Sequence, residues 1–182
     1  AYSFNGINQS ITAPVVSTLT DNFALTGWIR LDALSSGNQL LFCNGNSSNS
    51  GWGLLIDNAG FLNVIYGLIV LSPTSTQIPV NQWKHVALTR VNGVTKVYVD
   101  AVEVFSNAIP SPVTPTNNLT IGINNLGTEY LNGVMDDVKI FNIGLTPAQV
   151  LQDYNSFVCT QPITLNLKLF LEGFYTGNAA YF

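Results

Sequence analysis

The feature that most constrains this chain is a series of short strand-like segments separated by turn signals. FALTGWIRL (23–31) and WKHVALTRV (83–91) are the clearest examples. Successive side chains of such segments point to opposite faces, as they do in a β-strand. The pair Asn92-Gly93 is a strong hairpin signal, and it leads into TKVYVDAVEV (95–104). Further strands are expected at 39–43, 52–57, 61–67, 119–123 and 131–141.

One segment, LTPAQVLQDYN (145–155), has the pattern of a helix. Thr146 is placed to cap its N-terminus, Pro147 suits the first helical position, and Gln149 completes a capping box. About ten strands and one helix leave no βαβ rhythm. The sequence therefore predicts an all-β fold, an antiparallel two-sheet β-sandwich of jelly-roll type with one short helix near 146–155.

The composition excludes two classes of partner. Charged residues make up 9% of the chain, against roughly 25% in typical globular domains. Six dispersed Lys and Arg residues cannot form a patch that follows nucleic-acid phosphates. No apolar segment approaches the roughly 20 residues that span a membrane. The many Asn and Thr residues favour an extracellular protein.

The chain divides into a sandwich domain at 1–158 and a C-terminal segment at 159–182. ITLNLKLFL within that segment alternates like a strand and would expose an apolar edge if it stood alone. It is interpreted as an extra strand or linker, or as the start of a further domain, that needs a neighbouring domain or subunit. Cys43 and Cys159 form either a disulfide or two separate buried thiols.

Four stretches, taken in order, resemble the laminin-G-like, concanavalin-A-like jelly-roll family in its bacterial branch. They are YSFNGINQSITAP (2–14), FALTGWIRL (23–31), WKHVALTRVNGVTKVYVDAVEV (83–104) and the segment 119–155. The tail resembles segments of secreted surface proteins of Bacteroidetes-like bacteria. The resemblance implies a secreted or cell-surface bacterial protein.

This sequence departs from the family pattern at two positions. Asn5 stands where the family often has Asp, and Ala101 stands where it often has Gly.

The resemblance also implies a structural calcium ion near the doubled aspartate Asp136-Asp137. Neighbours on a strand point to opposite faces, so one carboxylate is expected to face the core. Asp136 or Asp137, the Asn5 side chain and backbone oxygens near Gly6 are the candidate ligands. The alternative is an inward carboxylate that accepts hydrogen bonds without a metal. The outward carboxylate is expected to lie in solvent beside Lys139.

The sequence does not predict an enzyme. His85 is the only histidine, and a packed structural role is expected for it. Glycoside hydrolases need paired carboxylates at a defined separation. Asp136 and Asp137 fall on opposite strand faces, as do Asp100 and Glu103.

Carbohydrate is the leading ligand class, because sugars stack on aromatic rings and bond to amides. Trp52 follows an Asn- and Ser-rich loop and is the best exposed candidate, whereas Trp28 and Trp83 are expected to be structural. The candidate ligand-binding residues are Trp52, Asn44, Asn46, Tyr66, Asn124, Asn125 and Tyr130.

The predicted function is a non-catalytic extracellular binding or adhesion module for a glycan or another extracellular ligand. The alternative is a structural subunit or spacer of a cell-surface assembly that uses the apolar C-terminal strand. A degenerate glycoside hydrolase is the third hypothesis.

Overall fold

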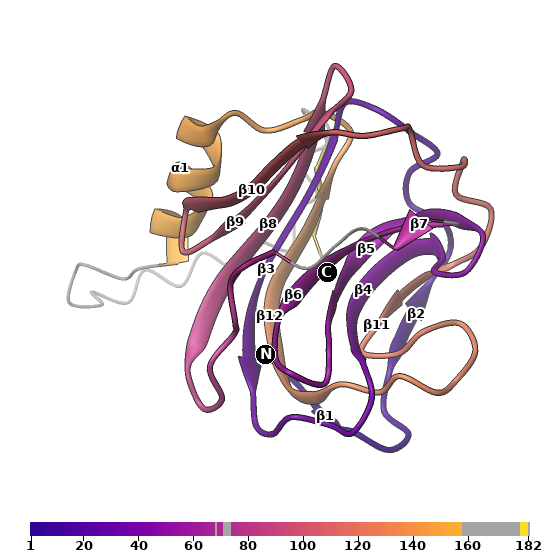
Figure 1. The fold of residues 1–182 in the computed structure, drawn as a ribbon, viewed down its shortest axis with the longest axis vertical. Coiled ribbons are helices and arrows are strands. Elements are labelled where there is room, and N and C mark those ends of the chain that lie inside the picture. Colours follow the sequence, from indigo (N-terminus) through magenta and orange to yellow (C-terminus); the bar gives the residue numbers. More distant parts are fainter. Residues whose placement is uncertain (68, 71–73, 158–178, 182) are drawn as a thin grey trace, which may run out of the picture.

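The computed structural model describes residues 1–67, 69–70, 74–157 and 179–181, which form two packed antiparallel sheets and one helix (Figure 1). The first sheet has the strand order β1-β12-β3-β8-β9-β10, and β13 also pairs with β12. Its strands are β1 (Tyr2–Asn5), β3 (Phe23–Leu31), β8 (Trp83–Val91), β9 (Val94–Val99), β10 (Val102–Ala108), β12 (Asn132–Phe141) and β13 (Ala179–Tyr181).

The second sheet has the order β2-β11-β4-β5-β6-β7. Its strands are β2 (Ile11–Ala13), β4 (Gln39–Asn46), β5 (Ser50–Ile56), β6 (Leu62–Tyr66), β7 (Ile69–Val70) and β11 (Leu119–Ile121). The predicted all-β two-sheet sandwich is confirmed. The sequence did not reveal that 2–14 holds two strands, one in each sheet.

The main hydrophobic core lies between the inner faces of the two sheets. Phe23, Leu25 and Ile29 on β3 meet Trp52 and Leu54 on β5, and all five side chains are fully buried. Burying one such side chain contributes about 1.5–3 kcal/mol. Phe23 and Trp52 stack with their ring centroids 4.1 Å apart. The alternation in the sequence thus determines which side chains fill the core.

Two tight turns build the β8-β9-β10 meander. Asn92 and Gly93 both have positive φ values, 49° and 82°, and they join β8 to β9 as the sequence predicted. The single strand expected at 95–104 is wrong. Asp100 and Ala101 also have positive φ values, 50° and 63°, and they turn the chain into β10. The sequence did not predict this turn, because turns with two positive φ values usually have glycine at the position that Ala101 occupies.

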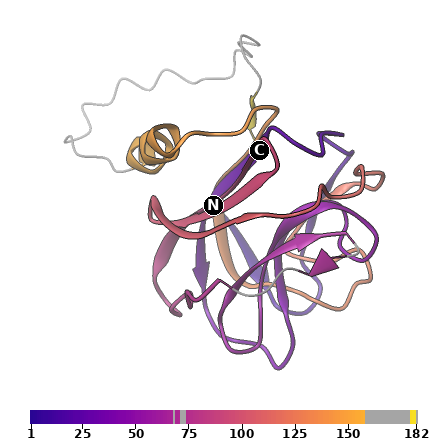
Figure 2. The ribbon, with the colours of Figure 1, turned by 45° about the horizontal axis from the view of Figure 1, so that its top comes forward.

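Helix α1 (Pro147–Phe157) covers the outer face of the first sheet, opposite the second sheet (Figures 1 and 2). Its predicted cap is confirmed. The backbone N–H of Gln149 donates to Thr146 Oγ1, at 3.3 Å, and the backbone N–H of Thr146 donates to Gln149 Oε1, at 2.9 Å. Leu145 and Val150 form a small second core with Ala24 and Ala87 of the sheet.

A polar chain joins the helix to the sheet. Asp153 of α1 accepts a hydrogen bond from His85 Nε2 at 3.0 Å and pairs with Lys139 Nζ at 2.7 Å. Lys139 also pairs with Asp137 at 2.6 Å. His85 is 1% exposed, which confirms its predicted structural role. Tyr154 stacks on Trp28 beside it.

These contacts shift the ionisation of the central carboxyl group. Burial by itself would raise the pKa of Asp153, but the hydrogen bonds from His85 and Lys139 and the Lys139 charge together lower this pKa to about 2. The ionised Asp153 therefore stabilises the docked helix.

The left-handed Ala101 predicts that Ala101→Gly stabilises the protein. Glycine adopts positive φ without the clash of a Cβ, so the free energy of unfolding should rise by about 0.5–1 kcal/mol after its entropy cost is included. Denaturant unfolding measures the change. Ala108→Gly, in the regular strand β10, is the control and should destabilise. A loss of stability in Ala101→Gly would contradict the strain argument.

The depressed pKa of Asp153 predicts an acid-labile helix contact. A lowered folded-state pKa contributes stability above the unfolded value near 4, and this stability is lost as the pH falls from about 4 to 2. The free energy of unfolding of the wild type should exceed that of Asp153→Asn, and this difference should be about 2 kcal/mol larger at pH 6 than at pH 2. Urea unfolding across this range measures the gap. Asp32→Asn is the matched surface control, and a pH-independent gap for Asp153→Asn would refute the prediction.

Candidate functional site

Trp52, the leading candidate for a sugar platform, is buried in the core and has no exposed ring face. Its Nε1 donates to the backbone oxygen of Leu19 at 2.9 Å, and its ring stacks on Phe23. The prediction of an exposed Trp52 is wrong. Residue 52 pairs with Tyr66 of β6 and faces the other sheet, because the even-numbered residues of β5 point inward.

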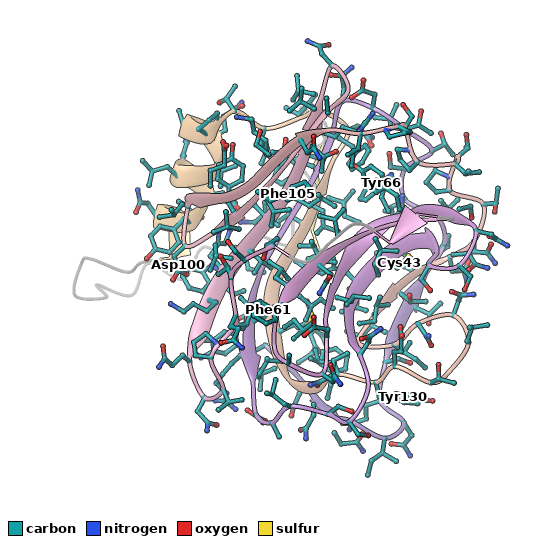
Figure 3. All side chains as sticks on the ribbon, in the orientation of Figure 1. Cys43, Phe61, Tyr66, Asp100, Phe105 and Tyr130 are labelled. Carbon is teal, nitrogen blue, oxygen red and sulfur yellow. The ribbon has the colours of Figure 1, made fainter. Side chains whose placement is uncertain are left out.

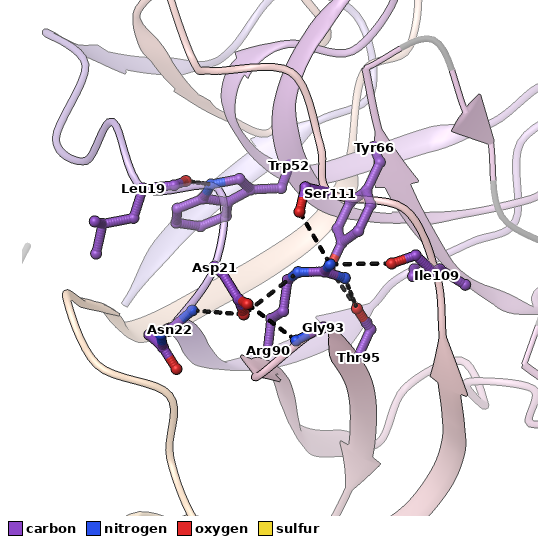
Figure 4. A network of polar contacts seen from close by, with 10 residues as sticks. All are labelled: Leu19, Asp21, Asn22, Trp52, Tyr66, Arg90, Gly93, Thr95, Ile109 and Ser111. Atoms are coloured by element: carbon purple, nitrogen blue, oxygen red, sulfur yellow. Dashed lines mark hydrogen bonds and ion pairs between the residues drawn. The ribbon is translucent and has the colours of Figure 1, made fainter.

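Tyr66 is also buried, in a polar network between the two sheets (Figure 4). Its hydroxyl lies 2.6 Å from Thr95 Oγ1, and the guanidinium of Arg90 lies 5.6 Å from its ring centre. Arg90 donates to Thr95 Oγ1 and to the backbone oxygen of Ile109, each at 3.0 Å. Asp21 lies 3.5 Å from Arg90 Nε. Tyr66 therefore holds the core together, and its predicted ligand-binding role is wrong.

Asn44 is the third buried candidate. Its Nδ2 donates to the Ser17 backbone oxygen at 2.7 Å, and its Oδ1 accepts from the Val16 N–H at 3.3 Å. Both ends of the amide thus fix the segment that precedes β3, and no part of the side chain is exposed for a ligand. Asn44 is a structural residue.

The other four candidates lie at the end of a strand or in a loop. Asn46 is the last residue of β4, and Asn124, Asn125 and Tyr130 belong to the connection 122–131 between β11 and β12. Asn125 Oδ1 accepts hydrogen bonds from the backbone N–H and the hydroxyl of Ser47, at 3.2 and 3.1 Å. Figure 3 shows Tyr130 at the lower edge of the molecule, apart from Tyr66 and Cys43.

A hollow of about 400 Å³ opens between these loops and the outer face of the second sheet. Leu55 of β5 and Ile65 of β6 provide its apolar floor, together with Leu126 from the connection. Leu55 and Ile65 point away from the main core and form a separate buried cluster with Leu40 and Cys43. The second sheet, whose outer face borders the hollow, lies on the side of the sandwich opposite α1 (Figure 2).

Amide, hydroxyl and carboxylate groups form the polar part of the hollow. They belong to Asn38, Ser47, Ser48, Asp57, Asn63, Asn124 and Glu129. Only Asn124 among the predicted ligand-binding residues lines the hollow, while Asn46 and Asn125 support its edge.

Asp57 and Asn63 are fixed by hydrogen bonds at one end of the hollow. Asp57 Oδ1 accepts from the backbone N–H groups of Ala59 and Phe61, each at 2.9 Å. Asn63 Nδ2 donates to the Phe61 backbone oxygen at 2.8 Å and to Asp57 Oδ2 at 3.3 Å. The Asn63 Nδ2 group uses both of its N–H donors in these two bonds, and the Asn63 Oδ1 atom takes no part in them.

Asn124 organises the connection that borders the hollow. Its Oδ1 accepts from the Thr128 N–H at 2.9 Å, and its Nδ2 donates to Thr128 Oγ1 at 3.1 Å. Glu129 Oε1 accepts from Asn38 Nδ2 at 3.0 Å. The connection 122–131 is thereby tied to the segment before β4, which gives the hollow a defined shape.

Sequence reasoning missed Asn38, Asp57, Asn63 and Glu129. Asn63 had left a trace, since it is the only polar residue in the apolar strand FLNVIY (61–66). The others come together only through the pairing of strands that are distant in the sequence.

Two of the candidate calcium ligands, Asp136 and Asp137, occupy a bulge in β12 of the first sheet. Asp136 pairs with Trp28 and Lys139 with Thr26, so β12 has one extra residue here. Asp137 takes a φ of 50°, and both carboxylates stay at the surface, about 30% exposed. The expected inward carboxylate is wrong, because the bulge turns Val138 into the core instead.

Both carboxylates already have cationic partners. Asp136 lies 3.2 Å from the amino group of Ala1, and Asp137 pairs with Lys139 as predicted. Asn5 is opposite Asn132, four residues along β12 from Asp136, which is about 13 Å at strand spacing. The Asn5 side chain closes a local turn with Ile7 and Asn8.

Gly6 adopts a φ of 71°, and its N–H donates to the Leu131 backbone oxygen at 2.8 Å. The structure thus brings Asp136 and Asp137 together but leaves Asn5 and Gly6 further along the strand pair. In the described part of the chain, no three His, Cys, Asp or Glu residues form a cluster suited to a metal ion.

Three other predictions concern the cysteines, the tryptophans and the tail. Cys43 is a free buried thiol, and burial raises its pKa to about 12. Cys159 and the strand expected at 163–171 lie outside the described residues.

Trp28 is buried, which agrees with the structural role expected for it, but Trp83 is 39% exposed with Arg30 over its ring. None of the described residues forms a helix with the length and hydropathy to cross a membrane.

The fold and the sequence together assign the chain to a family. A family model described as the concanavalin A-like lectin/glucanases superfamily matches residues 5–151. The chain belongs to this superfamily, in its laminin-G-like branch, as the sequence resemblance indicated. Among curated proteins, none matches the sequence significantly.

Solved structures of related architecture come from several organisms. A candidate carbohydrate-binding protein of Bacteroides ovatus superposes with a TM-score of 0.68 and 23% identity, over 82% of this chain and 46% of that one. Domain 4 of AbnA, an extracellular arabinanase of Geobacillus stearothermophilus solved with arabinotriose, superposes with a TM-score of 0.64 and 24% identity, over 79% of this chain and 71% of that one. Trypanosoma rangeli sialidase superposes with a TM-score of 0.69 and 20% identity, over 87% of this chain and 28% of the sialidase.

At these identities the similarity shows the fold alone. The chain spans less than half of the Bacteroides protein and less than a third of the sialidase.

Calcium binding by the doubled aspartate stays a prediction. It requires that excess calcium raise the free energy of unfolding relative to excess chelator, by about 3 kcal/mol at 100 times the dissociation constant. Asp136→Ala or Asp137→Ala should remove this difference. Thermal unfolding of the three proteins in both conditions tests it. The absence of any calcium shift in the wild type would leave the ion pairs with Ala1 and Lys139 as the role of the two carboxylates.

Proposed function

We propose that this chain is a non-catalytic carbohydrate-binding module that uses the hollow on the outer face of its second sheet. The observation that supports this most directly is the lining of the hollow. Fixed amide and carboxylate groups surround a small apolar floor, and sugar rings present both hydroxyls and apolar C–H groups. A hollow of about 400 Å³ falls in the size range of small-molecule sites.

The site differs from the one that the sequence predicted, because none of its lining residues in the described part of the chain is aromatic. Leu55, Ile65 and Leu126 take the place of a stacking platform. Sugar recognition here would depend on hydrogen bonds from a preorganised polar rim, with the leucine and isoleucine side chains excluding water beneath the ring. Preorganised groups improve affinity because little conformational freedom is lost on binding.

A binding role suits the two carboxylates of the hollow better than a catalytic one. Asp57 accepts two backbone hydrogen bonds that shape the β5–β6 turn, and Glu129 holds Asn38. Each carboxylate thus uses one oxygen for structural hydrogen bonds and leaves the other to accept from a sugar hydroxyl, which is the role of a binding residue. The Bacteroides and arabinanase structures support this assignment by analogy of fold, since carbohydrate figures in the description of both.

We further propose that the protein acts outside the cell. The arabinanase with the similar domain is extracellular, and a glycan ligand would be available there. The low content of charged residues and the Asn- and Thr-rich composition are consistent with that location.

The proposal predicts that saccharide binding depends on Asn63 and Leu126. Binding is first sought on a glycan array and then measured by isothermal titration calorimetry. Asn63→Ala removes the Oδ1 acceptor of a largely buried side chain and should weaken affinity about tenfold, as expected for one lost hydrogen bond. Leu126→Ala, at an exposed position of the rim, should weaken it several-fold.

Leu151→Ala is the matched control for this experiment, since Leu151 is an exposed leucine on α1, on the opposite side of the molecule. Its affinity should equal that of the wild type. Thermal unfolding of each variant separates lost binding from lost folding. Equal affinities in all four proteins would place the site elsewhere, and an array without any bound saccharide would refute the proposed function.

A further inference from the structure

The hollow has more open hydrogen-bond acceptors than open donors. Glu129 uses Oε1 for Asn38, and its Oε2 accepts no hydrogen bond from the described residues. Asn63 is 5% exposed, and its Oδ1 accepts none either. Among the described residues, only Asn63 donates to Asp57 Oδ2, at 3.3 Å.

Some donors around the hollow are engaged within the protein, whereas the Ser48 hydroxyl and the second N–H of Asn38 and of Asn124 make no hydrogen bond to the described residues. Asn124 Nδ2 donates to Thr128, and the Ser47 hydroxyl donates to Asn125. Asn38 Nδ2 donates to Glu129. The acceptors left for a ligand include oxygen atoms of two carboxylates, and these match a ligand that donates.

The electrostatics act in the same direction. Asp57 and Glu129 both line the hollow, and none of its lining residues in the described part of the chain is Lys, Arg or His. The chain as a whole has a formal net charge of −4. An anionic group that enters this hollow would lose hydration and find two negative charges and no cationic partner.

We propose that the hollow selects neutral saccharides and rejects saccharides that bear carboxylate or sulfate groups. This inference rests on the proposed function and specifies its ligand class. A neutral sugar offers hydroxyl donors to Glu129 Oε2, Asn63 Oδ1 and Asp57 Oδ2. A carboxylate or sulfate offers only acceptors to the same atoms.

The test uses pairs of saccharides that differ in an acidic group. The pairs are galactotriose with trigalacturonic acid, lactose with 3′-sialyllactose, and N-acetyllactosamine with its 6-sulfate. They are printed on one array with neutral arabino-, xylo- and gluco-oligosaccharides, and the bound members are titrated at pH 7 in low salt. Every saccharide that binds is expected to be neutral, and each neutral member of a bound pair should bind at least tenfold tighter than its acidic counterpart.

Glu129→Gln tests whether the charge of the hollow sets this preference. The variant keeps an oxygen for Asn38 and removes one negative charge from the rim, so the ratio of neutral to acidic affinity should fall several-fold. Glu103→Gln is the control, because Glu103 lies on β10 of the other sheet, where it pairs with Lys96. It changes the net charge equally and should leave the ratio unchanged.

The outcomes separate this inference from the proposed function. Acidic saccharides that bind as tightly as their neutral counterparts, or more tightly, would overturn the selectivity and leave saccharide binding intact. A ratio that shifts equally in Glu129→Gln and Glu103→Gln would overturn the role of the hollow in the selectivity. An array on which neither neutral nor acidic saccharides bind would overturn the proposed function and this inference together.

Discussion

The burial of Arg90 between the two sheets is the interaction on which much of this structure depends. A guanidinium cannot be deprotonated at any ordinary pH, so its charge must be compensated inside the sandwich. Asp21, Thr95 and the Ile109 backbone oxygen compensate it, and the ring of Tyr66 reaches it from the second sheet. These groups come from segments far apart in the sequence, and the single cation fixes their relative positions.

The Arg90 network also explains why the candidate aromatic residues are not available to a ligand. Tyr66 has to face inward to reach Arg90 and Thr95, and the alternation of paired strands then places its neighbour Trp52 on the same inner face. The opposite faces of β5 and β6 are left with Leu55, Asn63 and Ile65. The hollow is thus lined by the residues that remain on the outer face once Tyr66 and Trp52 face the core between the sheets.

The two outer faces of the sandwich have different roles. The first sheet is closed by α1, where Asp153 joins His85 and Lys139. Among the described residues, the connection between β11 and β12 covers part of the second sheet and borders the hollow. The sandwich has one outer face covered by α1 and one that carries the hollow. Its strands and short turns hold the polar groups around the hollow in fixed positions, as a binding site requires.

The sequence by itself determined the fold class, the Asn92-Gly93 hairpin, the capped helix and the structural role of His85. These follow from local rules, since the period of two in strands and the conformational preferences of Gly, Pro and Thr act within a few residues. Only the tertiary structure decided the direction of Trp52 and the surface position of Asp136 and Asp137. A bulge in β12 adds one residue and leaves both carboxylates at the surface, and no local sequence pattern indicates it.

The candidate site depended on tertiary structure most of all. Asn38, Asp57, Asn63 and Glu129 are unremarkable in the sequence, and strand pairing brings them to one rim. The sequence limited the chemistry, because so few charged residues are present that the hollow had to be lined mainly by amides and hydroxyls. The fold determined which of those groups remain open to a ligand, because hydrogen bonds between distant segments use up some atoms and leave others free.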